Sequence, residues 1–163
     1  MWLSDRRGFL LGAATALLGG CGFAPAYGTS GAASRLQNAI HVDAPKNHFG
    51  YLVTRRIEER LGAGGAGAPF TLSLETKFSQ ESLGSTSDGQ LTRYHVNGST
   101  TYVLRRAADL TQIDTGTVYN FTAYSASGST VATLAAQRDA QDRLMIALAD
   151  QVIERLVLAA PDI

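Results

Sequence analysis

Residues 70–78 read FTLSLETKF, and their alternation decides the fold. The even positions, from Phe70 to Phe78, are apolar except for Thr76, while the odd positions are Thr, Ser, Glu and Lys. Because successive side chains of a strand point to opposite faces, this order gives one apolar face and one polar face. The stretch therefore predicts a half-buried strand of an antiparallel sheet.

Two more strand-like stretches follow. Residues 80–90 form a polar connection, and its Asp88-Gly89 step favours a hairpin turn. Residues 91–106 and 115–125 are rich in Thr, Tyr and Val, which favour strands, and residues 107–114 turn the chain between them. Three successive strands with short connections predict an antiparallel meander.

Two stretches with helical periodicity flank the meander. In residues 48–61 the apolar side chains recur three or four positions apart and form one stripe. Residues 134–158 carry a similar stripe, made of Met145, Leu148, Ala149, Val152 and Leu156. A short strand is expected at residues 39–42. The glycine-rich residues 62–68 should form a loop and not a nucleotide-binding motif, because a helix precedes them and a strand follows.

Together these elements predict an α+β fold. We expect a two-layer sandwich in which two helices pack on one face of an about four-stranded, mostly antiparallel sheet.

The first 20 residues have the features of a secretory signal peptide. Arg6 and Arg7 precede an apolar run that is far shorter than the roughly 20 residues of a transmembrane helix. Leu18-Gly19-Gly20-Cys21 then reads as a bacterial lipobox, in which the cysteine is the point of cleavage and lipid attachment. We therefore predict a lipoprotein signal peptide at 1–20, lipidation of Cys21, a lipidated tether at 21–35 and a single domain at 36–160. The arginine pair suits both the Sec and the twin-arginine export routes, which stay open.

Composition argues against several classes of function. The chain has 14 basic and 14 acidic side chains, and loss of residues 1–20 removes two arginines and one aspartate, which leaves a net charge of −1. A net charge near zero gives no basic surface of the kind that binds nucleic acid, so we expect no nucleic-acid partner. With one cysteine and three scattered histidines, we expect no disulfide within the chain, no metal and no cofactor. No nucleophile elbow or phosphate-binding loop is present, so the sequence predicts a protein that is not an enzyme.

Arginines are the candidate binding residues. Arg138 falls in the expected entry turn of the last helix, where backbone amides would assist a bidentate contact between its guanidinium and a phosphate. Arg93, Arg105, Arg106 and Arg143 are further candidates, although most surface arginines are simply solvated.

The mature N-terminus resembles that of a known family. The run Cys21-Gly22-Phe23-x-Pro25-x-Tyr27-Gly28 is similar to the opening C-G-F-x-[PL]-x-Y-G of the lipopolysaccharide-assembly lipoproteins of the LptE family. Residues 90–94, QLTRY, resemble the family's G-Q-x-x-x-Y strand entry, and residues 134–142 resemble the opening of its last helix. The resemblance spans nearly the whole chain and is sharpest in the N-terminal octet.

This resemblance implies a partner and a ligand. It implies a non-enzymatic protein that forms a plug inside the outer-membrane β-barrel LptD, assists the assembly of that barrel and the insertion of lipopolysaccharide, and itself binds lipopolysaccharide. A basic residue at the position of Arg138 is implicated in that binding. The family's second basic position is occupied here by Ser87 and Asp88, which leaves Arg138, together with Arg93, as the lipopolysaccharide-binding candidates.

The expected location is the outer membrane. The residue after Cys21 is Gly22 and not the aspartate associated with retention in the inner membrane. The domain would then lie on the periplasmic side or within the barrel lumen, anchored to the membrane through the N-terminal lipid. Two alternatives remain open at this point: a lipoprotein accessory subunit of a transport ATPase system, and a lipid-anchored hydrolase.

Overall fold

The computed structural model describes residues 31–85, 91–126 and 129–160. The predicted signal peptide and Cys21 lie outside this part of the chain. The elements follow in the order α2 (Ala32–Leu36), β1 (Ile40–Val42), α3 (His48–Leu61), β2 (Phe70–Ser85), β3 (Leu91–Arg106), β4 (Gln112–Ser125) and α4 (Thr130–Ala159). The predicted fold class is confirmed, because the described chain is an α+β unit with a four-stranded sheet and helices packed against it.

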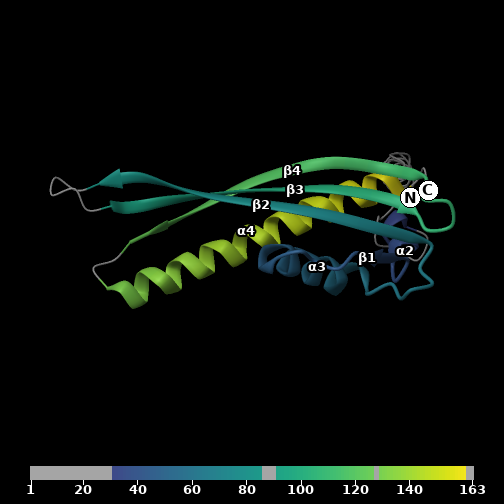
Figure 1. Cartoon of the computed structure of the whole chain (residues 1–163), viewed down its shortest axis with the longest axis horizontal. Coiled ribbons are helices and arrows are strands. Elements are labelled where there is room, and N and C mark those ends of the chain that lie inside the picture. Colours follow the sequence, from purple (N-terminus) through teal and green to yellow (C-terminus); the bar gives the residue numbers. More distant parts are fainter. Residues whose placement is uncertain (1–30, 86–90, 127–128, 161–163) are drawn as a thin grey trace, which may run out of the picture.

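The sheet has the strand order β1-β2-β3-β4. β2, β3 and β4 form the expected antiparallel meander, while β1 pairs in parallel with the start of β2. Figure 1 shows three long strands running the length of the molecule, with α4 crossing them diagonally and with α2, β1 and α3 gathered at one end. We call this the proximal end, and we call the opposite end, where β2 leads to β3, the distal end.

One face of the sheet forms the core with the helices, and we call it the inner face. Its side chains alternate along the strands as the sequence predicts. Leu72, Val96 and Leu104 are 0% exposed. The helices cover them with the buried residues Val53, Ile57, Leu61, Leu144, Met145, Leu148, Val152, Ile153 and Leu156. Burying each such side chain contributes about 1.5–3 kcal/mol, so this layer is the main source of stability.

Gly98 lets α4 approach the sheet closely. A Cβ atom at this position would lie 2.9 Å from Cδ1 of Leu148 and 3.0 Å from Cδ2 of Leu144. Carbon atoms do not pack that closely, so a side chain here would push α4 away from β3. The glycine therefore sets the distance between the two layers where the helix crosses.

The end of β2, the starts of β4 and α4, and the helix α2 differ from the prediction. β2 continues through residues predicted as a polar connection, because these still pair with β3, as Gln80 does with Val96. α4 begins at Thr130, four residues early, because Oγ of Ser129 accepts a hydrogen bond from the backbone N–H of Ala132. α2 overlaps the last residues of the predicted tether, and its Leu36, the first residue of the predicted domain, is 1% exposed because it packs into the core.

Candidate functional site

Arg138 does not occupy the start of the last helix. Because Ser129 caps α4, Arg138 falls in its third turn, where the backbone N–H groups already bond within the helix. The prediction that free backbone amides at the helix N-terminus assist Arg138 in binding a phosphate is therefore wrong. The side chain of Arg138 is nevertheless exposed near the distal end, and it makes no ion pair with any residue in the described ranges.

Arg93 lies in the sheet, on β3, and not on a helix. It pairs with Ser125 across the β3–β4 ladder. It lies three positions from the buried Val96, so its side chain leaves from the face opposite the helices, and it is exposed. The structure thus brings Arg93 and Arg138 to the same end of the molecule but to opposite sides of the sheet, and they do not form one two-residue clamp.

A polar network joins the distal part of α4 to the sheet. Nε2 of Gln137 donates to Oε1 of Gln80 at 3.1 Å, and Nε2 of Gln80 donates to the hydroxyl of Tyr124 at 2.9 Å. The rings of Tyr124 and Tyr94 stack with centroids 5.0 Å apart. Burial and the neighbouring Tyr94 raise the pKa of Tyr124, against the lowering effect of the Gln80 hydrogen bond. Tyr124 is therefore a neutral hydrogen-bonding group at physiological pH.

The remaining candidate arginines have structural partners. Arg105 donates to the hydroxyl of Ser73 at 3.2 Å, and Arg106 lies 3.5 Å from Asp109. Arg143 pairs with Asp139 at 2.9 Å, one turn back along α4. The two ion pairs, of Arg106 and Arg143, are on the surface, where such pairs contribute little.

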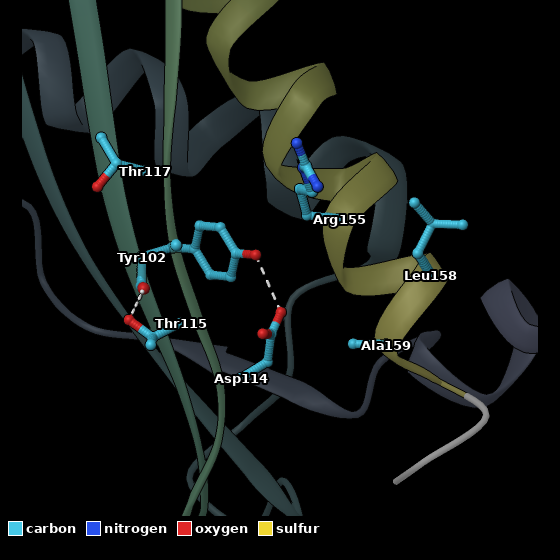
Figure 2. Close-up of a pocket in the computed structure, with 8 residues that line it drawn as sticks. Tyr102, Asp114, Thr115, Thr117, Arg155, Leu158 and Ala159 are labelled. Atoms are coloured by element: carbon cyan, nitrogen blue, oxygen red, sulfur yellow. Dashed lines mark hydrogen bonds between the residues drawn. The ribbon is translucent and has the colours of Figure 1, made fainter.

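A cavity of about 450 Å³ lies at the proximal end, between β4 and the last turns of α4. Figure 2 shows the hydroxyl of Tyr102 pointing to Asp114, with Arg155 and Leu158 approaching from the helix. The Tyr102 hydroxyl donates to Oδ2 of Asp114 at 2.9 Å. Gly116 makes room for this ring, since a Cβ there would lie 3.0 Å from it.

The protonation state of Tyr102 decides what this hydroxyl can do. Burial, first, and then the hydrogen bond to Asp114 raise the pKa of Tyr102 to about 12, while the charge of Arg155 acts in the opposite direction. A phenol with that pKa stays protonated at neutral pH, so it donates hydrogen bonds and does not act as a general base. Sequence reasoning missed this site, because Asp114 was assigned to the turn before β4.

The described residues hold no cluster of three or more His, Cys, Asp or Glu side chains that could bind a metal ion. Among the helices in the same ranges, none is both long and apolar enough to cross a membrane.

Comparison with known proteins decides the family. The family model for lipopolysaccharide assembly, LptE, matches residues 37–156, which covers nearly all of the described fold. This chain belongs to the LptE family. The resemblance recognised in the sequence is therefore confirmed, and LptE membership makes the chain a lipopolysaccharide-assembly lipoprotein. The family is not catalytic, which agrees with the expectation that this member is not an enzyme.

Solved structures share the fold of this LptE-family chain. A lipoprotein from Caulobacter crescentus CB15 is 20% identical, with a TM-score of 0.66, and the match covers 80% of this chain and 96% of that one. Rare lipoprotein B from Shewanella oneidensis is 12% identical, with a TM-score of 0.54 and coverages of 76% and 96%. A minor lipoprotein from Acinetobacter baumannii is 15% identical, with a TM-score of 0.52 and coverages of 73% and 88%. No curated protein sequence matches the chain.

Proposed function

We propose that this chain is an outer-membrane lipoprotein, anchored through Cys21, that complexes with an LptD-type β-barrel. In this role it assists assembly of the barrel and the insertion of lipopolysaccharide into the outer membrane. The observation that carries the proposal is the family match across residues 37–156, which covers nearly all of the described fold. The signal peptide and lipobox read from the sequence supply the anchor.

The uncovered face of the sheet supports a partner with a polar interior. We call the side of β2, β3 and β4 that faces away from the helices the outer face. Many of its side chains are hydroxyls or amides: Thr71, Ser73, Ser79, Asn97, Ser99, Thr101, Thr115 and Thr117. The lumen of an outer-membrane barrel is itself polar, so these hydroxyl and amide groups can lie against it.

Lipopolysaccharide binding is assigned to Arg138, with Arg93 as a second contact. A guanidinium binds phosphate through two parallel N–H groups, and Arg138 is exposed with this fork unoccupied by any described ion-pair partner. Because the two arginines lie on opposite sides of the sheet, each would contact a separate anionic group. Removal of one should therefore weaken binding without abolishing it.

Depletion and co-purification test the barrel partnership. If the proposal holds, cells depleted of the protein accumulate a misassembled barrel and lose lipopolysaccharide from the surface, and a tagged chain extracted in mild detergent brings down a large heat-modifiable barrel protein. Cells depleted of an unrelated outer-membrane lipoprotein serve as the control. Normal barrel folding after depletion would rule out the proposed partnership, and co-purification with a transport ATPase instead would establish the alternative.

The substitution Arg138→Asp tests the ligand assignment. It reverses the charge on an exposed side chain, so lipopolysaccharide binding should fall about tenfold while barrel association stays intact. Arg55→Asp is the matched control, because Arg55 is also an exposed helical arginine but lies on α3. If both variants bind lipopolysaccharide like the unmodified protein, Arg138 is only a solvated surface charge.

A further inference from the structure

The cavity at the proximal end holds two opposite charges that do not pair. Arg155 and Asp114 both line this cavity of about 450 Å³, a volume in the usual range of ligand sites. They form no ion pair with each other, and Arg155 forms none with any other residue in the described ranges. The pKa of Tyr102 is raised first by burial, and the charge of Arg155 opposes this, so the guanidinium lies within electrostatic reach of that hydroxyl. The cavity therefore separates a cation from an anion and is complementary to a ligand that carries both charges.

Arg155 supplies the contact for an anionic group. Its side chain is exposed and approaches the cavity from α4 (Figure 2). A guanidinium is planar and binds a phosphate through two parallel N–H groups. Arg155 lies one helical turn before Ala159, about 5.4–6 Å along the axis. A phosphate on Arg155 would thus lie one turn away from the end of the helix.

Asp114 and the end of α4 supply the contact for a cationic group. Oδ2 of the half-buried Asp114 accepts the Tyr102 hydroxyl at 2.9 Å, and no residue in the described ranges donates to its Oδ1. The last carbonyl groups of an α-helix have no partner within the helix and carry partial negative charge. The last turn of α4, LVLA at residues 156–159, contains no basic side chain that would offset this charge. A cation with N–H groups is therefore favoured between Asp114 and the helix end.

These acceptors select a primary ammonium over a quaternary one. Carboxylate and carbonyl oxygens bind a cation through its N–H groups, which a quaternary ammonium lacks, whereas the quaternary ion is held by a cage of aromatic rings. Tyr102 is the one aromatic residue that lines this cavity. The threonine hydroxyls are already engaged, because Thr115 donates to the carbonyl oxygen of Tyr102 at 2.9 Å and Thr117 bonds to Thr101 at 3.0 Å.

The cavity also lies at the end where the chain is expected to meet the membrane. α2, the first described element, lies at the proximal end (Figure 1). Ten residue steps (31 − 21) separate the predicted lipid on Cys21 from Gly31, which is a span of at most about 35 Å. Leu158 lines the cavity and is 72% exposed, so an apolar side chain lies in solvent beside the polar groups.

The charges of the cavity match one class of lipid headgroup. We propose that the proximal cavity binds the phosphoethanolamine group of a membrane lipid, with Arg155 on the phosphate and Asp114 on the ammonium. The inference rests on the lipid anchor of the proposed function and adds a site and a ligand to it. An ethylene group joins the phosphate to the ammonium, so the two charges of the ligand lie about as far apart as one turn of helix. Leu158 would then contact the glycerol and the first part of the acyl chains.

Vesicle flotation with the mature chain tests the proposal. The chain carries Cys21→Ser, so that no lipid anchors it, and no barrel is present. Vesicles of phosphatidylcholine that contain phosphatidylethanolamine should bind the chain about tenfold more tightly than phosphatidylcholine alone or with phosphatidylglycerol. Equal binding to all three kinds of vesicle, or binding to none, would overturn the proposal. Either failure would leave the barrel partnership standing, because co-purification tests that partnership separately.

Two substitutions separate the two contacts. Arg155→Gln should weaken binding to the ethanolamine vesicles about tenfold. Arg55→Gln is the control, because Arg55 is also an exposed helical arginine but lies on α3. Asp114→Asn keeps an oxygen for the Tyr102 hydroxyl but removes the negative charge, so it should abolish the preference for ethanolamine over choline. Thermal unfolding checks that each variant folds. Equal losses from the two arginine variants, or an unchanged preference in Asp114→Asn, would overturn the proposal.

A soluble headgroup distinguishes a membrane lipid from a free ester. Glycerophosphoethanolamine should displace the chain from the ethanolamine vesicles, whereas glycerophosphocholine at the same concentration should not. Failure of glycerophosphoethanolamine to compete would overturn the assignment of the headgroup. Binding of the soluble ester without binding to vesicles would overturn the assignment of the ligand to a membrane lipid.

Discussion

The proximal and distal parts of α4 are held in different ways. From Ala140 onward the helix buries Leu144, Met145, Leu148, Val152 and Leu156, all 0% exposed. Before Ala140 it has no fully buried residue: Ala136 is only partly buried against the core, and Gln137 donates a hydrogen bond to Gln80. One helix is therefore fixed by apolar packing at one end and by amide contacts at the other. The apolar packing of the proximal part therefore provides stability. The amide contact of the distal part positions residues such as Arg138 and contributes little to the free energy of unfolding.

Truncation of the proximal core should have the largest effect. Leu148→Ala removes a side chain that is 0% exposed and that packs at Gly98, so we expect a loss of about 3 kcal/mol in the free energy of unfolding. Leu134→Ala, on the distal part of the same helix, removes a side chain that is 44% exposed and should cost about 0.5 kcal/mol or less. Urea denaturation followed by circular dichroism measures both, and equal losses would contradict the division of α4 into two parts.

Alkaline pH should weaken the proximal end by a smaller amount. The pKa of Tyr102 is about 12 in the folded protein against an ordinary value of 10.0, so its stabilising contribution is complete below pH 10 and is lost as the pH rises toward 12. The loss should be up to about 2 kcal/mol. Tyr102→Phe should reduce this dependence and leave the part due to the raised pKa of Tyr124, whereas Tyr119→Phe, which removes the hydroxyl of an exposed tyrosine, should leave it unchanged.

The test follows the free energy of unfolding from pH 9 to pH 11.5 and the phenolate absorbance in parallel. A Tyr102→Phe variant with the same alkaline slope as the unmodified protein would exclude Tyr102 as its source.

Removal of the hydrogen bond between Gln137 and Gln80 should have the smallest effect on the free energy of unfolding, but it should loosen the start of α4 locally. Gln137→Ala removes the hydrogen bond to Gln80, so the free energy of unfolding should fall by about 1 kcal/mol or less. Amide hydrogen exchange should accelerate in residues 130–139 and remain unchanged in residues 144–156, because the first turns can open without exposing the core. Gln112→Ala, an exposed glutamine at the proximal end of β4, is the control. Uniform acceleration along α4 would show that the two parts unfold together.

Sequence patterns predicted the fold best where one face of an element is covered. The limits of α3 and β3 match the prediction, and β2 starts at Phe70 as expected. At the distal end both faces of β2 are accessible to water, so its later residues lose the apolar alternation even though their backbone still pairs with β3. The start of α4 was missed for a related reason: Thr130 to Thr133 are exposed or half-buried, partly β-branched and carry no apolar stripe.

The candidate site was harder to predict from the sequence than the fold was. Placing Arg138 at a helix entry required the true start of α4, which depends on the Ser129 cap. The Tyr102–Asp114 pair depends on the β3–β4 register, in which Tyr102 lies opposite Gly116. That register is set by the length of the turn after Arg106, and the sequence pattern placed the start of β4 three residues late. The sequence indicated the chemistry of single residues, but it did not show which of them lie next to one another in the fold.

The order of the elements, with α4 after the three long strands, has a consequence for the newly made protein. Synthesis proceeds from the N-terminus, so β2, β3 and β4 exist before the helix that covers most of their inner face. Until residues 130–159 have been added, side chains such as Val96 and Leu104 face water at the centre of a long sheet. A chain that lacks residues 130–159 should therefore expose a long apolar sheet face to water and aggregate.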